Sequence, residues 1–231
     1  MTRIKWDQTG ERFYETGVDR GVLYVRDSEG GYEGGVPWNG LTGVTQTPTG
    51  AEPQPQYADN IKYVTLISAE EFEGTIEAFT YPDEFAQCDG TATPAPGVFV
   101  GQQPRKTFGL AYRTLVGNDV DGQEHAYKLH LIYGAMAAPS EKAHTTVNDS
   151  PEALTFSWTI TADKVEVPDI EIDGVDLKPT AIVTLDSREI PEATMREIED
   201  TLYGSDDADA VDPALPLPHE IVQMVQAGAA A

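Results

Sequence analysis

The chain has 231 residues, and its 39 acidic and 15 basic residues give a formal net charge of −24. Because affinity for phosphate groups comes from Lys and Arg, this balance excludes a protein whose task is to hold nucleic acid tightly. The single cysteine, Cys88, excludes an intrachain disulfide and a CxxC metal site, as expected for a protein assembled in a reducing cytoplasm. We expect neither a signal peptide nor membrane insertion, because no run approaches the roughly 20 apolar residues of a membrane span.

The first 60 residues predict an extended arm, a strand and a long loop. Residues 1–10 are expected to form an N-terminal arm, and residues 12–26 contain a strand centred on 21–25. Residues 45–60 hold three prolines, no Lys or Arg and almost no hydrophobic side chains, so we expect a long loop there. This loop is either a flexible surface segment or an arm that becomes ordered only against a neighbouring molecule.

Residues 61–67 predict a strand, and residues 70–81 fit either a strand or a helix. We favour the strand, because Gly74 and Thr75 would weaken a helix at its centre. Its apolar face would consist of Phe72, Gly74, Ile76 and Ala78. Its opposite face would carry Glu71, Glu73 and Glu77. No basic residue lies between Lys62 and Arg105, where seven acidic residues form a local acidic surface.

The middle of the chain contains the clearest strands. Pro82 opens a helical turn over 82–87, and residues 106–116 predict a strand that forms a hairpin with the strand beginning at Tyr127. Residues 153–162 alternate most clearly, which predicts a half-buried strand. The apolar face is Leu154, Phe156, Trp158 and Ile160. The hydroxyl face is Thr155, Ser157, Thr159 and Thr161.

The C-terminal part predicts a short strand over 181–185, a helix over 191–203 and a second short helix over 219–226. The first helix begins at Pro191 and can end at Gly204. We therefore expect a main domain over 1–203, with its N-terminal arm (1–10) and long loop (45–60). An acidic C-terminal extension over 204–231 follows it.

No pattern in the chain predicts a catalytic, cofactor-binding or metal site. His125 and His130 have opposite parity in one predicted strand, so they cannot share a metal there. Residues 169–180 begin like an EF-hand loop but have Thr180 where a Glu is required, so a strand ending in a turn is the better interpretation. An adventitious cation at Asp169–Asp173 is the alternative. Nucleophile-elbow, phosphate-loop and dinucleotide-binding motifs are absent from the sequence, and we expect no enzyme.

Four segments, in order, carry a resemblance to a known family. They are KWDQTGERFYETGVDRGVLY, GVPWNGLTGVTQTPTGAEPQPQYADN, EGTIEAFTYPDEFAQCDG and YGAMAAPSEKAHTTVNDSPEALTFSWTITADKVEV. Together they resemble the major tail proteins, or tail tube proteins, of bacteriophages with long non-contractile tails. The resemblance is closest to those of actinobacterial phages and covers residues 3–203.

The resemblance implies a mainly β (α+β) fold, a tail-tube-type β-sandwich or barrel with one flanking helix and long extended loops. It also implies a structural virion protein whose hexameric rings stack into a tube for DNA passage. The implied partners are further copies of the chain, a tape-measure protein and a tail-terminator protein. Genomic DNA would cross the lumen without specific binding. The implied location is the phage tail, after assembly in the host cytoplasm.

Two sets of residues become candidate sites under this resemblance. Either the acidic face Glu71, Glu73 and Glu77 or the hydroxyl face Thr155, Ser157, Thr159 and Thr161 is expected to line the lumen. The expected contacts between rings are Thr47, Pro48, Glu52, Pro53, Gln54 and Tyr57. The polar connection over 138–152 is expected to contact another subunit. The alternative function is a β-sandwich that binds a receptor or carbohydrate.

Overall fold

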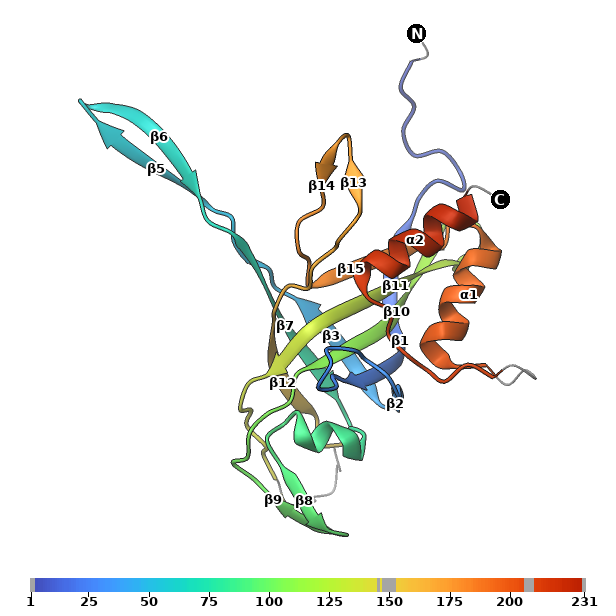
Figure 1. Cartoon of the computed structure of the whole chain (residues 1–231). Coiled ribbons are helices and arrows are strands. Elements are labelled where there is room, and N and C mark those ends of the chain that lie inside the picture. Colours follow the sequence, from blue (N-terminus) through green and yellow to red (C-terminus); the bar gives the residue numbers. More distant parts are fainter. Residues whose placement is uncertain (1–2, 145, 147–152, 206–209, 230–231) are drawn as a thin grey trace.

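The computed structural model describes residues 3–144, 146, 153–205 and 210–229, and it is mainly β with two α-helices (Figure 1). The nine strands of the main sheet are β1 (Tyr14–Val25), β2 (Val36–Trp38), β3 (Leu41–Gln46), β4 (Thr49–Gly50), β7 (Glu70–Ala78), β10 (Phe108–Asn118), β11 (Gly122–Ala137), β12 (Phe156–Ala162) and β15 (Ile182–Asp186). The hairpins outside it are β5 (Pro53–Ala58) with β6 (Ile61–Ile67), β8 (Ala92–Ala95) with β9 (Val98–Val100), and β13 (Glu171–Ile172) with β14 (Val175–Asp176). The helical elements are η1 (Asp83–Gln87), α1 (Glu192–Tyr203) and α2 (Pro218–Ala229).

The main sheet curls until its two edges meet. Its strand order is β2-β1-β10-β11-β12-β7-β3, with β15 also on β11 and β4 also on β7. The edge strands β2 and β3 are consecutive in the chain and are separated only by Asn39 and Gly40. A single kinked segment therefore borders both ends of the sheet. Gly21 permits the close approach, since a Cβ there would collide with the side chain of Leu41.

Strand β11 changes its partner halfway along its length. Lys128–Ile132 pair with β15, whereas Ala135–Ala137 pair with β12. Gly134 lies between the two segments with φ +63°, and its carbonyl accepts a hydrogen bond from the backbone N–H of Asp163 at 3.0 Å. A Cβ at Gly134 would collide with the backbone of Asp163, so this junction requires glycine.

Two hydrophobic cores lie on the two faces of the sheet. The first, inside the curl, includes Leu23, Trp38, Phe72, Ile76, Phe85, Phe108, Leu110, Tyr112, Ile132, Trp158 and Ile160. The second, between the sheet and the helices, includes Tyr24, Leu129, Leu131, Tyr133, Leu185, Met195, Ile198, Leu202, Leu215 and Ile221. Strand β10 is buried over most of its length because it contributes to both cores.

The second core also contains the C-terminal segment. Helix α1 follows Pro191 and ends at Gly204, as the sequence predicts. Leu215 and Ile221 are 3% and 0% exposed and pack with α1. The segment expected to form an extension beyond the main domain therefore contributes to its core over the described residues 210–229.

Three hairpins and the N-terminal segment project from this body (Figure 1). The longest is β5–β6, where the sequence analysis expected a loop over 45–60. That expectation was wrong for residues 45–46, which end β3, and for Thr49–Gly50 and Pro53–Ala58, which are strands. Residues 53–58 lack a hydrophobic strand pattern because both faces of the hairpin are exposed. Pro53 and Pro55 fit because β5 has a partner strand on one side only.

Candidate functional site

The acidic and hydroxyl faces predicted from the sequence are one surface. Strands β7 and β12 are antiparallel neighbours, and Ser157 lies opposite Glu77, Thr159 opposite Thr75, and Thr161 opposite Glu73. Residues that lie opposite each other on adjacent strands point to the same face. The intervening side chains Phe72, Ile76, Trp158 and Ile160 are buried, as the alternation predicts.

This surface, which we call the polar face, continues onto β3. Thr45 lies opposite Thr75, and Gly43 opposite Glu77. The helices cover β1, β10, β11 and β15 on the other side of the molecule and leave the polar face uncovered (Figure 1). Glu71 lies opposite Thr49 of β4, and Thr155 is exposed just before β12.

The polar face has no basic counterpart in the described part of the chain. None of Glu71, Glu73 and Glu77 forms an ion pair among the described residues. Their negative charges are therefore not neutralised by a basic side chain of the described chain. The surface combines uncompensated carboxylates with hydroxyl groups, and it can repel a polyanion while remaining hydrated.

The hairpin β5–β6, which we call the arm, exposes large apolar side chains on both of its faces. The exposed fractions of Tyr57, Ile61, Tyr63, Leu66 and Ile67 are 71%, 63%, 73%, 56% and 68%. Tyr63 and Ile67 share one face of β6 and Leu66 the other, because side chains alternate along a strand. A ribbon with two apolar faces and no core of its own indicates contact with other molecules.

The arm contains three of the six residues predicted to contact another ring, and the other three precede it in the chain. Pro53, Gln54 and Tyr57 lie in β5, and Glu52 directly precedes it. Thr47 and Pro48 lie at its base, where the backbone N–H of Thr47 donates to Glu73 O at 2.8 Å. The apolar side chains of β6 were not among the predicted contact residues. The run IKYVTLI indicates them, because its hydrophobic residues occupy both faces of the strand.

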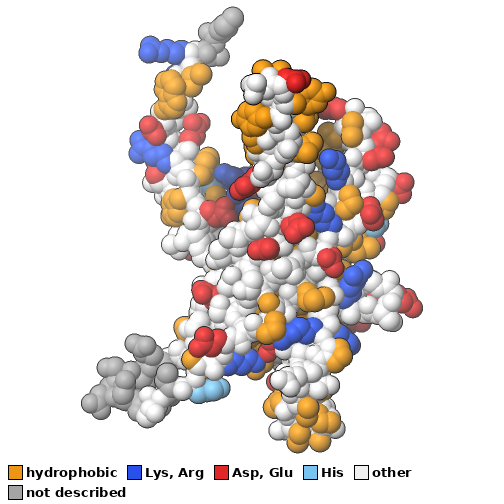
Figure 2. All heavy atoms as spheres, turned by 90° about the vertical axis from the view of Figure 1, so that its left-hand side faces the viewer, with side chains coloured by type: hydrophobic (Ala, Val, Ile, Leu, Met, Phe, Trp, Pro, Cys, Tyr) orange, Lys and Arg blue, Asp and Glu red, His pale blue; other side chains and the backbone are white. Residues whose placement is uncertain are grey.

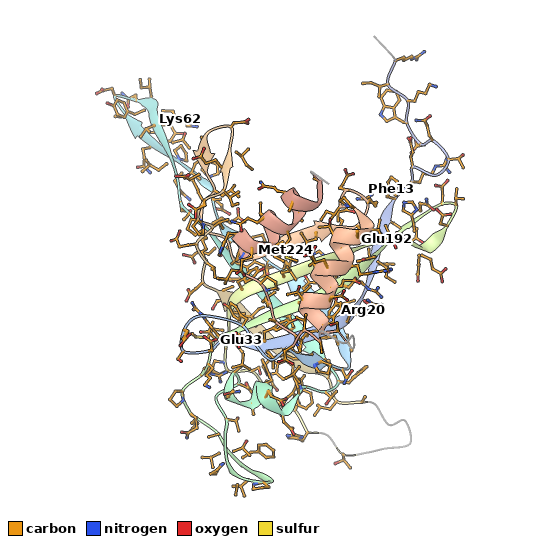
Figure 3. The ribbon with its side chains drawn as sticks, turned by 45° about the vertical axis from the view of Figure 1, so that its right-hand side comes forward. Phe13, Arg20, Glu33, Lys62, Glu192 and Met224 are labelled. Carbon is orange, nitrogen blue, oxygen red and sulfur yellow. The ribbon has the colours of Figure 1, made fainter. Side chains whose placement is uncertain are left out.

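The tip of the arm is a two-residue turn. Asp59 and Asn60 have φ of 49° and 61°, the left-handed geometry that suits hairpins of this length. Lys62 lies at this far end, away from the body (Figure 3). It is the only basic residue in the arm.

Hydrophobic side chains also gather at the opposite end of the molecule (Figure 2). Val98, Phe99 and Val100 of β9 are 48%, 61% and 43% exposed. The molecule therefore has apolar projections at both ends, an arrangement that suits association of copies end to end.

A buried carboxylate anchors the connection between β11 and β12. Asp89 is 8% exposed and accepts hydrogen bonds from Lys142 Nζ at 2.6 Å and Arg105 Nη1 at 3.4 Å. The Lys142 ammonium group also lies over the ring of Tyr81. Much of the connection predicted to contact another subunit, residues 145 and 147–152, lies outside the described residues.

The histidines are not arranged to bind metal together. His130 is 8% exposed, stacks on Tyr112 and lies 2.9 Å from Thr114 Oγ1, and burial lowers its pKa. His125 lies at the β10–β11 turn, 3.0 Å from Asp121 Oδ2. Among the described residues no group of three His, Cys, Asp or Glu side chains could hold a metal ion.

In the same part of the chain no helix has the length and apolar character to cross a bilayer.

Comparison with known proteins finds no matching family model and no matching curated protein. Among solved structures, a baseplate chain of the anti-feeding prophage has 8% identity and a TM-score of 0.36, covering 79% of this chain and 97% of its own. A chain of the PVC sheath-tube complex, an extracellular contractile injection system, has 12% identity and a TM-score of 0.31, covering 79% and 94%. A chain of the PVC sheath/tube terminator has 11% identity and a TM-score of 0.28, covering 79% and 99%. Similarities of this size assign neither a family nor a function to this chain.

Proposed function

We propose that this chain is a structural virion protein, the major tail subunit of a bacteriophage with a long non-contractile tail. Its hexameric rings stack into the tail tube through which genomic DNA enters the host. The single observation that carries this proposal is the arm, a hairpin whose apolar side chains have no cover within the described chain. An exposed apolar surface of this kind marks a site of contact with another molecule. The resemblance of residues 3–203 to tail tube proteins makes further copies of the chain the expected cover.

The polar face is the proposed lining of the tube. Duplex DNA carries about one negative charge per 1.7 Å of its axis, and a basic lining would bind it at many points. A lining of carboxylates and hydroxyls repels the phosphates and keeps the duplex hydrated. In this arrangement Glu71, Glu73 and Glu77 and the Ser/Thr row of β12 act together, with no catalytic, cofactor or metal site. The tape-measure and tail-terminator proteins would be the other partners.

Electron microscopy of the purified full-length chain and of phage tails tests this proposal. We expect rings with six subunits and tubes with a regular axial repeat of one ring. A discrete monomer or small oligomer without tubes, in both preparations, would contradict it.

The alternative, a tail component that binds a receptor or carbohydrate, is favoured by one observation. Tyr57 and Tyr63 are both highly exposed in the arm, whereas Trp38 and Trp158 are buried. Exposed Tyr rings are common at binding surfaces because they have an apolar body and a polar hydroxyl. Saturable glycan binding by a discrete oligomer, lost in Tyr57→Ala and Tyr63→Ala variants, would support this alternative instead.

A further inference from the structure

An apolar groove lies between the β13–β14 hairpin, strand β15 and the first turns of α2. Its volume is about 580 Å³, and its apolar lining includes Ile172, Val175, Ile182, Val183, Pro218 and Val222. Ile172 and Val175 are 60% and 67% exposed, so this side of the groove is open to solvent. The groove can therefore accept large apolar side chains from outside.

The rim of the groove is acidic. Residues 165–178, which form the hairpin and its flanks, contain five carboxylates and one Lys, Lys178. Glu171, Asp173 and Asp176 lie in the hairpin, and Asp176 and Lys178 both line the groove, so the hairpin keeps a net negative charge around it. Among the described residues none of these three carboxylates forms an ion pair. An occupant of this groove should therefore be both apolar and basic.

The N-terminal segment has this chemistry. Residues 3–6 read Arg-Ile-Lys-Trp, so in an extended conformation Ile4 and Trp6 point to one side and Arg3 and Lys5 to the other. Ile4 and Trp6 are 70% and 75% exposed. In a chain with a net charge of −24, two basic residues within four positions beside two large apolar ones are unusual. The hydrophobic side chains of the segment are therefore exposed to solvent, as Ile172 and Val175 are at the groove.

The segment and the groove of one chain lie near different ends of α2. Gly10 is held at the β10–β11 turn, where its N–H donates to Asp119 Oδ1 at 2.9 Å and its carbonyl accepts from Asn118. From there the segment leaves the body near the C-terminal end of α2, whereas the β13–β14 hairpin stands near the N-terminal end of that helix (Figures 1 and 3). Phe13 marks the point where the segment joins the body (Figure 3). A neighbouring copy is therefore the better source of the occupant.

We infer that the groove binds the N-terminal segment of a second copy of this chain. Ile4 and Trp6 fill the apolar floor, and Arg3 and Lys5 face the carboxylates of the β13–β14 hairpin. This inference rests on the proposed self-assembly and adds a defined pair of surfaces to it. Burying an indole together with an aliphatic side chain supplies the affinity, and the exposed charges select the orientation.

Cross-linking between two differently tagged full-length subunits tests the pair of surfaces. One subunit carries Lys5→Cys, which leaves Ile4 and Trp6 in place, and the other carries Val175→Cys, and assembled material is treated with a short bismaleimide. The native Cys88 is 0% exposed and should not react. We expect a cross-linked pair containing both tags. The matched control replaces Val175→Cys with Arg196→Cys on the exposed face of α1, which should give no such pair.

The outcomes separate this inference from the proposed function. Tubes that form normally without the cross-link overturn the groove assignment and leave the tail-tube proposal in place. A subunit carrying both Lys5→Cys and Val175→Cys that cross-links within one chain also overturns it, because the segment would then occupy its own groove. The absence of any ring or tube in unmodified protein contradicts the tail-tube proposal itself.

A charge exchange provides a second test that does not depend on cross-linking. Arg3→Glu with Lys5→Glu should weaken self-association about threefold to tenfold at low salt, because exposed ion pairs contribute modestly. A partner carrying Asp173→Lys with Asp176→Lys should restore association with this variant. Association that is unchanged by the first pair, or not restored by the second, contradicts the inference.

Discussion

Ser157 of β12 lies directly opposite Glu77 of β7 in the antiparallel sheet. Two strands separated by about 80 residues of sequence therefore present hydroxyls and carboxylates on one surface. From the sequence, the acidic face and the hydroxyl face were alternative linings. Periodicity assigns a side chain to a face of its strand but does not identify the neighbouring strand. The pairing of β7 with β12 joins the two candidate linings into one polar face.

Reversing the charge of the polar face should slow DNA passage. In Glu73→Lys with Glu77→Lys, each subunit gains two cations that can contact phosphate, and DNA binding should then weaken steeply with added salt. We expect tubes to form but genome ejection from phage carrying the variant to be slower at low salt. Time-resolved fluorescence of released DNA measures this.

The matched control is Glu192→Lys on α1, whose side chain is 93% exposed on the helical side of the molecule. It changes the charge in the same direction and should leave ejection unaffected. Equal effects of both substitutions would place the polar face outside the lumen.

Removing the apolar side chains of the arm should prevent assembly without unfolding the subunit. Tyr63 and Leu66 are 73% and 56% exposed on opposite faces of β6, so Tyr63→Ser with Leu66→Ser removes little from the folded core. If both are buried between subunits, each substitution should cost about 2 kcal/mol of contact energy. We expect an unchanged melting temperature by circular dichroism, with monomers replacing tubes in sedimentation velocity.

Val120→Ser is the control for this pair, because Val120 is 62% exposed at the β10–β11 turn and lies outside the arm. Its assembly should match that of the unmodified chain. If Tyr63→Ser with Leu66→Ser assembles as well as this control, the arm is not an assembly contact.

The strands with two unlike faces were predictable from the sequence. The alternation in β12 and β7 placed Trp158, Ile160 and Ile76 in the core, because one face of each strand is buried and the other is wet. In β10, Phe108, Leu110 and Tyr112 alternate in the same way and are buried in the first core. Helix α1 was also predictable, since Pro191 and Gly204 mark its ends.

The strand character of β5 and the packing of the C-terminal segment onto the body were not predictable from periodicity. Strand β5 carries prolines and polar residues, and only its pairing with β6 makes it a strand. The helix predicted over 219–226 is present as α2, but the burial of Leu215 and Ile221 depends on α1 and on strands far away in sequence. Long-range partners, rather than local preference, determined both elements.

Removing the buried carboxylate of Asp89 should destabilise the fold. Asp89→Ala leaves Lys142 and Arg105 without their shared partner, and breaking a buried ion pair in this way typically costs about 3–5 kcal/mol. The side chains of the two cations are 33% and 23% exposed, so water compensates in part and we expect about 2–4 kcal/mol. Urea denaturation of subunits kept monomeric by the arm substitutions measures this.

The control for Asp89→Ala is Glu192→Ala, which removes an exposed ion pair with Arg196 at 3.8 Å. We expect a change below about 0.5 kcal/mol for this substitution. A similar small loss in Asp89→Ala would mean that the connection from β11 to β12 is held by other contacts.

The stability of the subunit should fall between pH 7 and pH 5 because of His130. Its pKa is lowered from the ordinary value of 6.5, first because burial disfavours the charged ring, although Glu15 at 3.6 Å acts in the opposite direction. The folded state therefore keeps the ring neutral where the unfolded chain already binds a proton. The contribution of His130 to stability is fully present above 6.5, the pKa of the imidazole in the unfolded chain. It is lost as the pH falls below this value, by at most about 1.4 kcal/mol per pH unit.

His130→Gln should remove this dependence, since Gln can still bond to Thr114 and Thr184 but does not titrate. The carboxyl groups of Glu15, Asp19 and Asp186 have lowered pKa values, so their contribution is lost only at more acidic pH, below about 4.5. Urea denaturation at pH 7.5, 6.5 and 5.5 should therefore give a slope for the unmodified chain and almost none for the variant. If the variant keeps the slope, another group titrates in this window and the buried imidazole is not its source.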